Sequence, residues 1–413
     1  MLRERHVSVA VIGGGPAGLA AAIAAREAGC RDVVLLERDR LLGGILNQCI
    51  HDGFGLHRFG EAMTGPEYAR RDIVRFHELG IEAMTETMVM ELTKGRELLV
   101  SRRGELLRLT ADAVVLAMGC RERPRGALSI PGTRPAGIYT AGAAQNFVNL
   151  ENLMPGKRIC ILGSGDIGLI MARRMTLEGA KVEAVFELLP YSSGLPRNIQ
   201  QCLRDYNIPL YLSTTVTDII GSDRLEAVQV SSVGADRRPI PGTEKIFPCD
   251  TLLLSVGLIP ENELTRMAGI GINPVTNGAF VDGSLMTDAP GIFACGNVLH
   301  VHDLVDWVSL EAAEAGKSAA AWAAKACLAK AFAVVCPGQG VRYTVPSHAD
   351  TAKDVRISFR VASPSRGLSL VVKADGREIL RRKRVRLHPA VMEHLTLKGD
   401  QLNGCSELEV SVQ

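Results

Sequence analysis

The chain has 413 residues, 46% of them hydrophobic, and a formal net charge of +2 at pH 7. This length suits two or three domains with substantial cores, and the near-neutral charge argues against a nucleic-acid-binding or membrane-surface protein. No apolar run reaches the roughly 18 residues that a transmembrane helix needs. The ten cysteines lie nine or more residues apart, which argues against a zinc knuckle, a locally ligated iron–sulfur cluster and a CxxC disulfide, and suits a reducing cytosol.

The apolar N-terminus predicts a strand and a helix, because glycines and a proline interrupt what would otherwise resemble a signal peptide. The strand is expected over Val7–Ile12, and Gly13–Gly18 (GGGPAG) forms the turn into a helix over Pro16–Ala28. In such a turn the glycines permit a tight bend, close approach of the backbone to a pyrophosphate, and close packing of the helix on the strand. The helix N-terminus favours an anion by about 0.3–1 kcal/mol. A second strand, Asp32–Leu36, leads to Glu37, which is placed to accept hydrogen bonds from a ribose.

The same pattern occurs a second time, 150 residues later. Strand Arg158–Leu162 precedes Gly163–Gly168 (GSGDIG), and a helix is expected over Asp166–Gly179. Strand Lys181–Phe186 then leads to Glu187, which lies 24 positions after the first glycine, as Glu37 does in the first copy. Two copies with matched spacing predict two dinucleotide sites on one chain.

The repeat predicts an α/β fold with two Rossmann-like dinucleotide-binding domains and a small C-terminal all-β domain. The first domain is expected to be discontinuous (1–122 and 266–332), the second to be inserted in it (123–265), and the β-rich domain to follow (333–413). Strands Ala111–Gly119 and Asp250–Gly257 are expected to close the two halves, and an Ala-rich helix is expected over Ser309–Leu328. Alternating patterns in the last domain predict strands over Val355–Val361, Leu368–Val372 and Leu408–Val412.

These motifs resemble those of the pyridine nucleotide-disulfide oxidoreductase superfamily of flavoproteins. The resemblance rests on GGGPAG, AMG at 117–119, GSGDIG, SVG at 255–257 and GIFACGN at 291–297. It implies that the first fingerprint holds FAD and the second NAD(P)H, and that the late GIFACGN segment returns to the FAD domain. The usual Gly-Asp of that segment is Gly296-Asn297 here, and Asn can still hydrogen-bond a ribityl hydroxyl or a phosphate.

Three longer segments resemble a narrower group: LGGILNQCIHDGFGL at 42–56, GDIGLIMARRMTLEGAKV at 165–182 and GNVLHVHDLVD at 296–306. This group is the flavoprotein found beside a small Cys-rich protein and an anaerobic glycerol-3-phosphate dehydrogenase-like subunit. The small FAD subunits of opine oxidase and hydrogen cyanide synthase are more distant relatives. The resemblance implies an electron-transfer component with such partners, cytoplasmic or peripheral to the membrane through them. The β-rich tail is expected to serve either these contacts or a homodimer.

The fingerprints and the resemblance together assign the cofactor-binding residues. For FAD these are Gly13, Gly15, Pro16, Ala17, Gly18, Glu37, Arg38, Gly43, Gly44, Met118, Gly119, Gly296 and Asn297. For the nicotinamide nucleotide they are Gly163, Gly165, Asp166, Ile167, Gly168, Glu187 and Gly257. No metal site is assigned, because His300-x-His302 offers only two ligands from one loop.

NAD(H) is favoured over NADP(H) at the second site. The carboxylate of Glu187 would repel a 2′-phosphate, and Leu188 and Leu189 offer no arginine to receive one. Arg173 and Arg174 are expected on the helix, away from that strand end.

Three residues are candidates for chemistry beside the flavin: Cys49, His51 and His302. A disulfide reductase would pair Cys49 with a cysteine four residues earlier, and that residue is Ile45. Cys49 is therefore expected to be a lone thiol, a charge-transfer partner, a docking contact or a small buried residue. The histidines His300 and His302 precede a helix that, in the superfamily, points at the flavin. They are expected either to stabilise negative charge there or to be ordinary loop and capping residues.

The leading hypothesis is an FAD protein that exchanges a hydride with NAD(H) and relays electrons to or from a partner dehydrogenase subunit. One alternative is a flavin-dependent dehydrogenase acting directly on an amine, imino acid or polyol phosphate. A second is a structural subunit with a vestigial nucleotide site, and a third is a thiol-disulfide reductase acting through Cys49. The basic run Arg381–Arg386 is expected to be either a solvated strand or a docking surface for an acidic partner or an anionic membrane.

Overall fold

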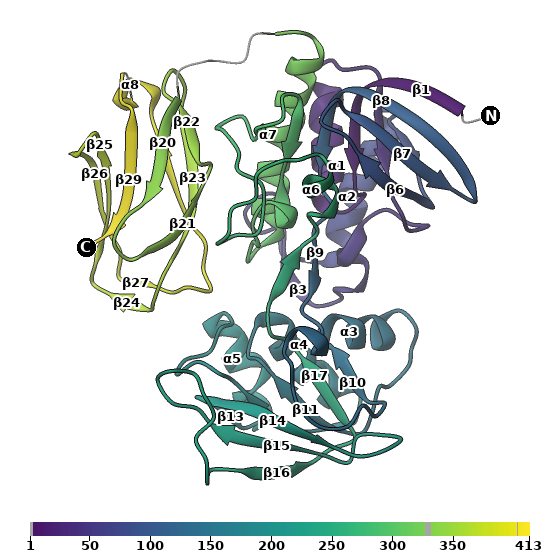
Figure 1. The fold of residues 1–413 in the computed structure, drawn as a ribbon, viewed down its shortest axis with the longest axis vertical. Coiled ribbons are helices and arrows are strands. Elements are labelled where there is room, and N and C mark those ends of the chain that lie inside the picture. Colours follow the sequence, from purple (N-terminus) through teal and green to yellow (C-terminus); the bar gives the residue numbers. More distant parts are fainter. Residues whose placement is uncertain (1–2, 327–331, 403) are drawn as a thin grey trace. The chain divides into compact units, whose positions relative to one another are not determined.

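The computed structural model describes residues 3–326, 332–402 and 404–413 (Figure 1). Its contacts divide the chain into two compact units, Met1–Cys120 with Pro260–Gln413, and Arg121–Ile259. The chain passes between them twice, where strands β9 (Cys120–Glu122) and β18 (Leu258–Pro260) pair. Each unit holds a parallel sheet with helices, and the first also carries a strand-rich module, so the expected fold class is confirmed.

The first unit is built on a seven-stranded sheet in the order β5-β2-β1-β8-β7-β6, with β19 also paired to β8. The parallel strands are β5 (Glu82–Met84), β2 (Val33–Leu36), β1 (Arg3–Ile12), β8 (Glu105–Leu116) and β19 (Ile292–Ala294). The antiparallel strands are β7 (Glu97–Arg102) and β6 (Thr87–Leu92). The pairing of β19 with β8 brings the late GIFACGN segment to the carboxyl end of β8. Ligands of open α/β sheets bind at this edge.

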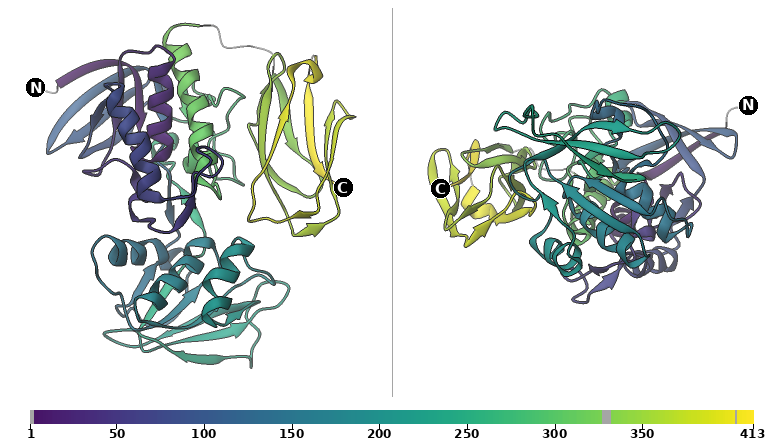
Figure 2. Two further views of the ribbon diagram at one scale, coloured as in Figure 1. Left: turned by 180° about the vertical axis from the view of Figure 1, so that it is seen from behind. Right: turned by 90° about the horizontal axis from the view of Figure 1, so that it is seen from below.

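Helices α1 (Pro16–Glu27) and α7 (Val305–Ala323) lie side by side in both Figure 1 and Figure 2, and α2 (Gly65–Glu78) lies next to α1. Helices α1 and α7 touch at Gly316 of α7, where an added Cβ atom would lie 2.1 Å from the carbonyl oxygen of Ala21 in α1. The helix expected over Ser309–Leu328 begins earlier, because Val305 and Val308 continue its buried face. Leu328 lies outside the described residues.

The second unit has a parallel sheet in the order β10-β17-β11-β12-β13. These strands are β10 (Ile138–Thr140), β17 (Thr251–Leu254), β11 (Arg158–Leu162), β12 (Lys181–Phe186) and β13 (Leu210–Tyr211). One hydrophobic cluster joins this sheet to helices α3 (Ala141–Asn149), α4 (Asp166–Leu177) and α5 (Pro196–Cys202). Another joins it to an antiparallel sheet of β14 (Thr214–Ile220), β15 (Ala227–Ser232) and β16 (Lys245–Pro248).

The C-terminal module has its own hydrophobic core between two main sheets. One sheet has the order β22-β20-β29-β25-β26, with bounds His348–Asp350, Phe332–Pro337, Glu407–Val412, Ser369–Ala374 and Arg377–Lys383. The other is β21-β23-β28, with bounds Val341–Val345, Val355–Val361 and Glu393–Leu397. No helix in the described ranges is both long and apolar enough to cross a membrane.

The close contact at Gly316 predicts that adding a single methyl group there lowers the stability of the protein. Gly316→Ala would normally favour a helix, but its methyl group would collide with the α1 backbone. We expect the free energy of unfolding to fall by about 1–3 kcal/mol, measured by denaturant titration. Gly126→Ala is the control, because a Cβ at Gly126 meets nothing within 4 Å. Equal stability of the two variants would contradict the packing described.

Candidate functional site

The first Gly-rich turn brings strand and helix into backbone contact. Gly13 has φ +106°, and a Cβ there would lie 2.5 Å from the oxygen of Ala117. A Cβ at Gly18 would lie 1.7 Å from the oxygen of Gly13. The N-cap of α1, Gly15, offers no side-chain cap, whereas Thr64 caps α2. The first N–H groups of α1 are thus left to a ligand or solvent, as an anion site requires.

The carboxylate of Glu37 is buried at the end of β2 and holds this turn. Its Oε2 accepts the N–H of Gly14 at 2.6 Å, and its Oε1 accepts the N–H of Asp39 at 2.8 Å. The neighbouring Arg38 is exposed. An ionised carboxylate has about four lone-pair sites, so Glu37 retains acceptor capacity for a ribose hydroxyl.

Two further segments meet the N-terminus of α1. The N–H of Gly43 donates to Gly14 at 2.8 Å, and a Cβ at Gly44 would lie 2.9 Å from the Cα of Gly15. Gly296 also lies close to α1, because a Cβ added to it would lie 2.9 Å from the Cβ of Ala17. Three segments far apart in sequence therefore converge here, with glycine at each close approach, and this edge fits the pyrophosphate arm of a dinucleotide.

Other residues assigned to FAD lie around this edge. Met118 and Gly119 follow β8, and the carbonyl of Gly119 accepts the N–H of Glu261. Asn297 is engaged internally, since its Oδ1 accepts the N–H of His302 at 3.0 Å and its Nδ2 lies 3.6 Å from the sulfur of Cys120.

The second Gly-rich turn is also held by a buried glutamate, and here side-chain hydroxyls add to the backbone hydrogen bonds. Oε2 of Glu187 accepts the N–H of Ser164 at 3.0 Å, and Oε1 accepts the N–H of Leu189 at 2.9 Å. The hydroxyls of Ser164 and Ser193 also donate to Oε2. Gly165, at the N-cap of α4, again has no side-chain cap. A Cβ at Gly168 would lie 2.9 Å from the oxygen of Gly163.

The segment after Glu187 folds back over this turn. Asp166, the first residue of α4, accepts hydrogen bonds from the N–H of Leu195 at 2.8 Å and from Asn198 at 2.6 Å. Ile167 is half-buried, and Gly257, after β17, is exposed with φ +101° and accepts the N–H of Arg123. The second turn is therefore a formed but partly covered site.

The candidates Cys49 and His51 lie in the loop after Gly43. The thiol of Cys49 donates to the carbonyl of Ile45 at 3.3 Å, and burial raises its pKa to about 12. A thiol with that pKa is protonated at neutral pH and is a poor nucleophile. The ring of His51 lies 5.0 Å from that of Phe54.

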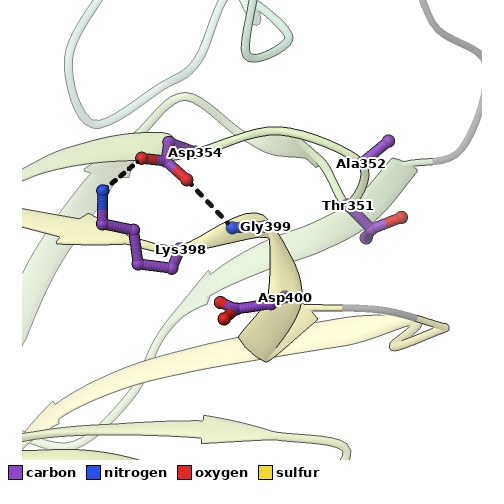
Figure 3. A pocket seen from close by; sticks show the side chains of 6 residues that line it. All are labelled: Thr351, Ala352, Asp354, Lys398, Gly399 and Asp400. Carbon is purple, nitrogen blue, oxygen red and sulfur yellow. Dashed lines mark hydrogen bonds and ion pairs between the residues drawn. The ribbon is translucent and has the colours of Figure 1, made fainter.

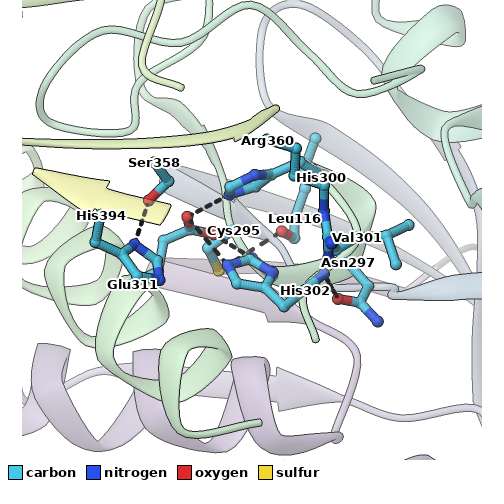
Figure 4. Close-up of polar contacts among 11 residues, drawn as sticks. Leu116, Cys295, Asn297, His300, Val301, His302, Glu311, Ser358, Arg360 and His394 are labelled. Carbon is cyan, nitrogen blue, oxygen red and sulfur yellow. Dashed lines mark hydrogen bonds and ion pairs between the residues drawn. The ribbon is translucent and has the colours of Figure 1, made fainter. Parts of the chain in front are cut away.

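The third candidate, His302, belongs to a buried cluster around Glu311, shown in Figure 4. Nε2 of His300 lies 2.7 Å, and Nε2 of His302 3.4 Å, from Oε2 of Glu311, and both imidazoles are almost fully buried. The other oxygen of Glu311 accepts the N–H of Gly296 at 2.8 Å. One carboxylate therefore joins both histidines to the segment assigned to FAD.

Ionisation in this cluster is set by burial and by these contacts. Burial lowers the pKa of His300, which keeps its imidazole neutral. Burial alone would raise the pKa of Glu311, but interactions with His300 and His302 hold it below its usual value. Burial and the nearby Arg356 guanidinium lower the pKa of His394 to about 3.

The C-terminal module contributes to the same region. Arg360, on β23, donates to the carbonyl of Val301 at 3.0 Å, and the N–H of Met392 donates to Asp303 at 3.2 Å. The ring of His394, on β28, lies 4.4 Å from that of Trp307 in α7. The loop before α7 thus contacts both the module and Glu311 of α7.

Sequence reasoning missed several residues of this region. Glu311 lies within an Ala-rich helix, and Asp306, also buried, accepts the N–H groups of Gly55, His57 and Arg58 at 2.8–3.1 Å. Their only sequence signal is an acidic residue on an otherwise apolar helix face.

An open hollow of about 460 Å³ on the module is separate from these residues (Figure 3). It is lined by Thr351, Ala352, Asp354, Lys398, Gly399 and Asp400. Lys398 pairs with Asp354 at 2.6 Å, and Asp354 also accepts the N–H of Gly399. None of the residues assigned to a cofactor lines it.

Curated relatives share the main part of the chain. Hydrogen cyanide synthase subunit HcnB of Pseudomonas protegens is 24% identical over 74% of this chain and 66% of its own length. The ferredoxin–NAD(+) reductase subunit of the benzene 1,2-dioxygenase system of Pseudomonas putida is 29% identical over 70% of this chain and 66% of its own length. An opine oxidase subunit of Rhizobium meliloti is 28% identical over 65% of this chain and 53% of its own length. The chain thus spans less than two thirds of the length of each of these relatives.

The fold is also found among solved structures. Thioredoxin reductase of T. acidophilum matches with a TM-score of 0.63 over 77% of this chain and 98% of its own, at 21% sequence identity. The model of the pyridine nucleotide-disulphide oxidoreductase family matches residues 7–324, which include both Gly-rich turns and the late GIFACGN segment. The chain therefore belongs to the pyridine nucleotide-disulphide oxidoreductase family.

Proposed function

We propose that this protein exchanges a hydride between NAD(H) and FAD and relays electrons to or from a partner dehydrogenase subunit. The observation that carries the proposal is the repeated arrangement of a Gly-rich turn, an uncapped helix and a buried carboxylate, centred on Glu37 and Glu187. When bound, the two cofactors supply the hydride donor and acceptor, and the protein supplies orientation and exclusion of water.

FAD is assigned to the first unit. Its pyrophosphate would lie at the N-terminus of α1, between Gly15, Gly44 and Gly296, and its ribose would meet Glu37. The fit is supported by the three glycines at which a side chain would fill this edge or collide with it. Asn297 would have to exchange its hydrogen bond with the His302 backbone to reach a ribityl hydroxyl or phosphate.

NAD(H) is assigned to the second unit. Glu187 would receive the adenosine ribose, and its charge disfavours a 2′-phosphate at that position. The relative from the benzene dioxygenase system is named as a reductase that uses NAD(+), which supports the same choice.

A partner subunit is supported by the names of the relatives. The hydrogen cyanide synthase, benzene dioxygenase and opine oxidase proteins are each described as a subunit. The protonated thiol of Cys49, with no cysteine four residues before it, further favours electron relay over disulfide reduction.

Anaerobic titration with NADH tests the proposal directly. We expect the visible flavin absorbance of the purified protein to bleach with NADH, and NADPH to bind at least about tenfold more weakly, a difference of about 1.4 kcal/mol. A flavin that stays oxidised at saturating NADH would rule out the exchange.

Glu187→Gln tests the source of nucleotide preference. Removing the charge should reduce the ratio of NADPH to NADH dissociation constants by about tenfold, since repulsion of the 2′-phosphate is lost. Glu183→Gln is the matched control, because Glu183 lies on the strand that leads to Glu187 and pairs with Lys181 and Arg158. An unchanged ratio in Glu187→Gln would show that other residues select the nucleotide.

The high pKa of Cys49 predicts its reactivity. Alkylation of Cys49 by iodoacetamide should be slow at pH 7 and should rise about tenfold per pH unit to about pH 10, because the thiolate fraction is still rising there. In the urea-unfolded chain the same thiol should level off above its ordinary pKa of about 8.5. A plateau near that value in the folded protein would show an accessible, reactive thiol and would revive the disulfide reductase hypothesis.

A further inference from the structure

The junction of α7 with the C-terminal module concentrates buried polar atoms that have no hydrogen-bond partner. In the described part of the chain these atoms include His300 Nδ1, His302 Nδ1, His394 Nε2 and Asp303 Oδ1. Only one further atom of this kind, in Arg102, is found among the described residues. Buried polar groups are almost always satisfied, so four such atoms in one region indicate missing partners. An ion held by Nε2 of His300 and His302 would leave their Nδ1 atoms to water, whereas Nε2 of His394 is unpaired and could itself bind the ion.

The same region holds a set of metal-ligating side chains. His300, His302 and Glu311 each offer one ligand atom, and these atoms all lie within 4.8 Å of one another. The 3.4 Å between His302 Nε2 and Glu311 Oε2 is close to the roughly 3.3 Å that separates two ligands on a tetrahedral zinc ion. His300 would have to move slightly outward from its 2.7 Å contact with Glu311.

We propose that His300, His302 and Glu311 bind a divalent transition-metal ion of the zinc class, and that His394, which lies outside this group of three, moves inward to become the fourth ligand. Three imidazoles and one carboxylate form a nitrogen-rich set that suits Zn²⁺. Figure 4 shows the side chains of His300, His302 and His394 gathered around Glu311. Four protein ligands would close the coordination shell, which is typical of a structural site.

The surrounding charges are compatible with a bound cation. Glu311 and the partly unpaired carboxylate of Asp303 supply negative charge. The positive charges of Arg356 and Arg360 oppose a cation here, although the contacts of both groups lie elsewhere: Arg360 donates to the carbonyls of Val301 and Pro389, and Arg356 lies over the ring of Trp307 at 4.6 Å.

The ligands come from three segments. His300 and His302 follow the segment assigned to FAD, Glu311 lies in α7, and His394 lies in β28 of the module. The ion would therefore fasten the module to the FAD-binding part of the first unit. In the sequence His300-x-His302 offers only two ligands from one loop, and the other two side chains lie in a helix and in a strand of the module.

The experiment uses the full-length, tag-free protein with FAD bound. The protein is dialysed against a chelator, returned to metal-free buffer, and titrated with Co²⁺ and with Zn²⁺. We expect one ion per chain, a visible absorption spectrum of tetrahedral Co²⁺, and a higher melting temperature with Zn²⁺ than without it.

Variants identify the ligands. His394→Ala and Glu311→Gln should each weaken Zn²⁺ affinity by at least about tenfold. His348→Ala is the control, because His348 is exposed on the same module, and it should bind as the wild type does.

Two results would overturn the proposal. One is a wild-type protein that takes up no ion and melts at the same temperature with and without Zn²⁺, which would assign the unpaired atoms to buried water. The other is uptake that survives in both His394→Ala and Glu311→Gln, which would show adventitious surface binding. The wild-type measurements stand alone if a variant fails to fold.

Discussion

One buried carboxylate at the end of the second strand holds each Gly-rich turn in place. Glu37 and Glu187 each bind the N–H at the second position of their turn and the N–H two residues downstream. A buried ionised carboxylate is stable only with such donors, so the strand end and the turn keep a fixed register. In this register the N-termini of α1 and α4 have no side-chain caps. Anion binding at either helix depends on these free N–H groups.

The local parts of this architecture could be predicted from sequence, and the long-range parts could not. Strands β11, β12 and β23 agree with their expected ranges residue for residue, because each depends on an apolar or alternating run bounded by turn residues. Asp306 binds the backbone of residues about 250 positions earlier, and His394 meets the loop before α7 through the module's docking. Periodicity and spacing report on neighbours within a segment and contain no information on which distant segments meet.

The two turns share a plan and differ in how much of the carboxylate is already used. Glu37 accepts two backbone N–H groups, whereas Glu187 accepts two backbone N–H groups and the hydroxyls of Ser164 and Ser193. A ribose at Glu187 would have to use the capacity left on Oε1, which accepts one N–H, or replace a hydroxyl at Oε2, which accepts three hydrogen bonds. The first turn therefore offers a ribose more open acceptor capacity than the second.

Helix α7 connects three parts of the first unit through polar contacts. Asp306 holds the loop at residues 55–58, Glu311 holds Gly296 and the histidines, and the ring of Trp307 contacts those of His57 and His394. Directed hydrogen bonds and ring contacts accept one relative position, whereas an apolar face tolerates sliding. The module is therefore docked in a specific register against the helix whose Glu311 binds Gly296.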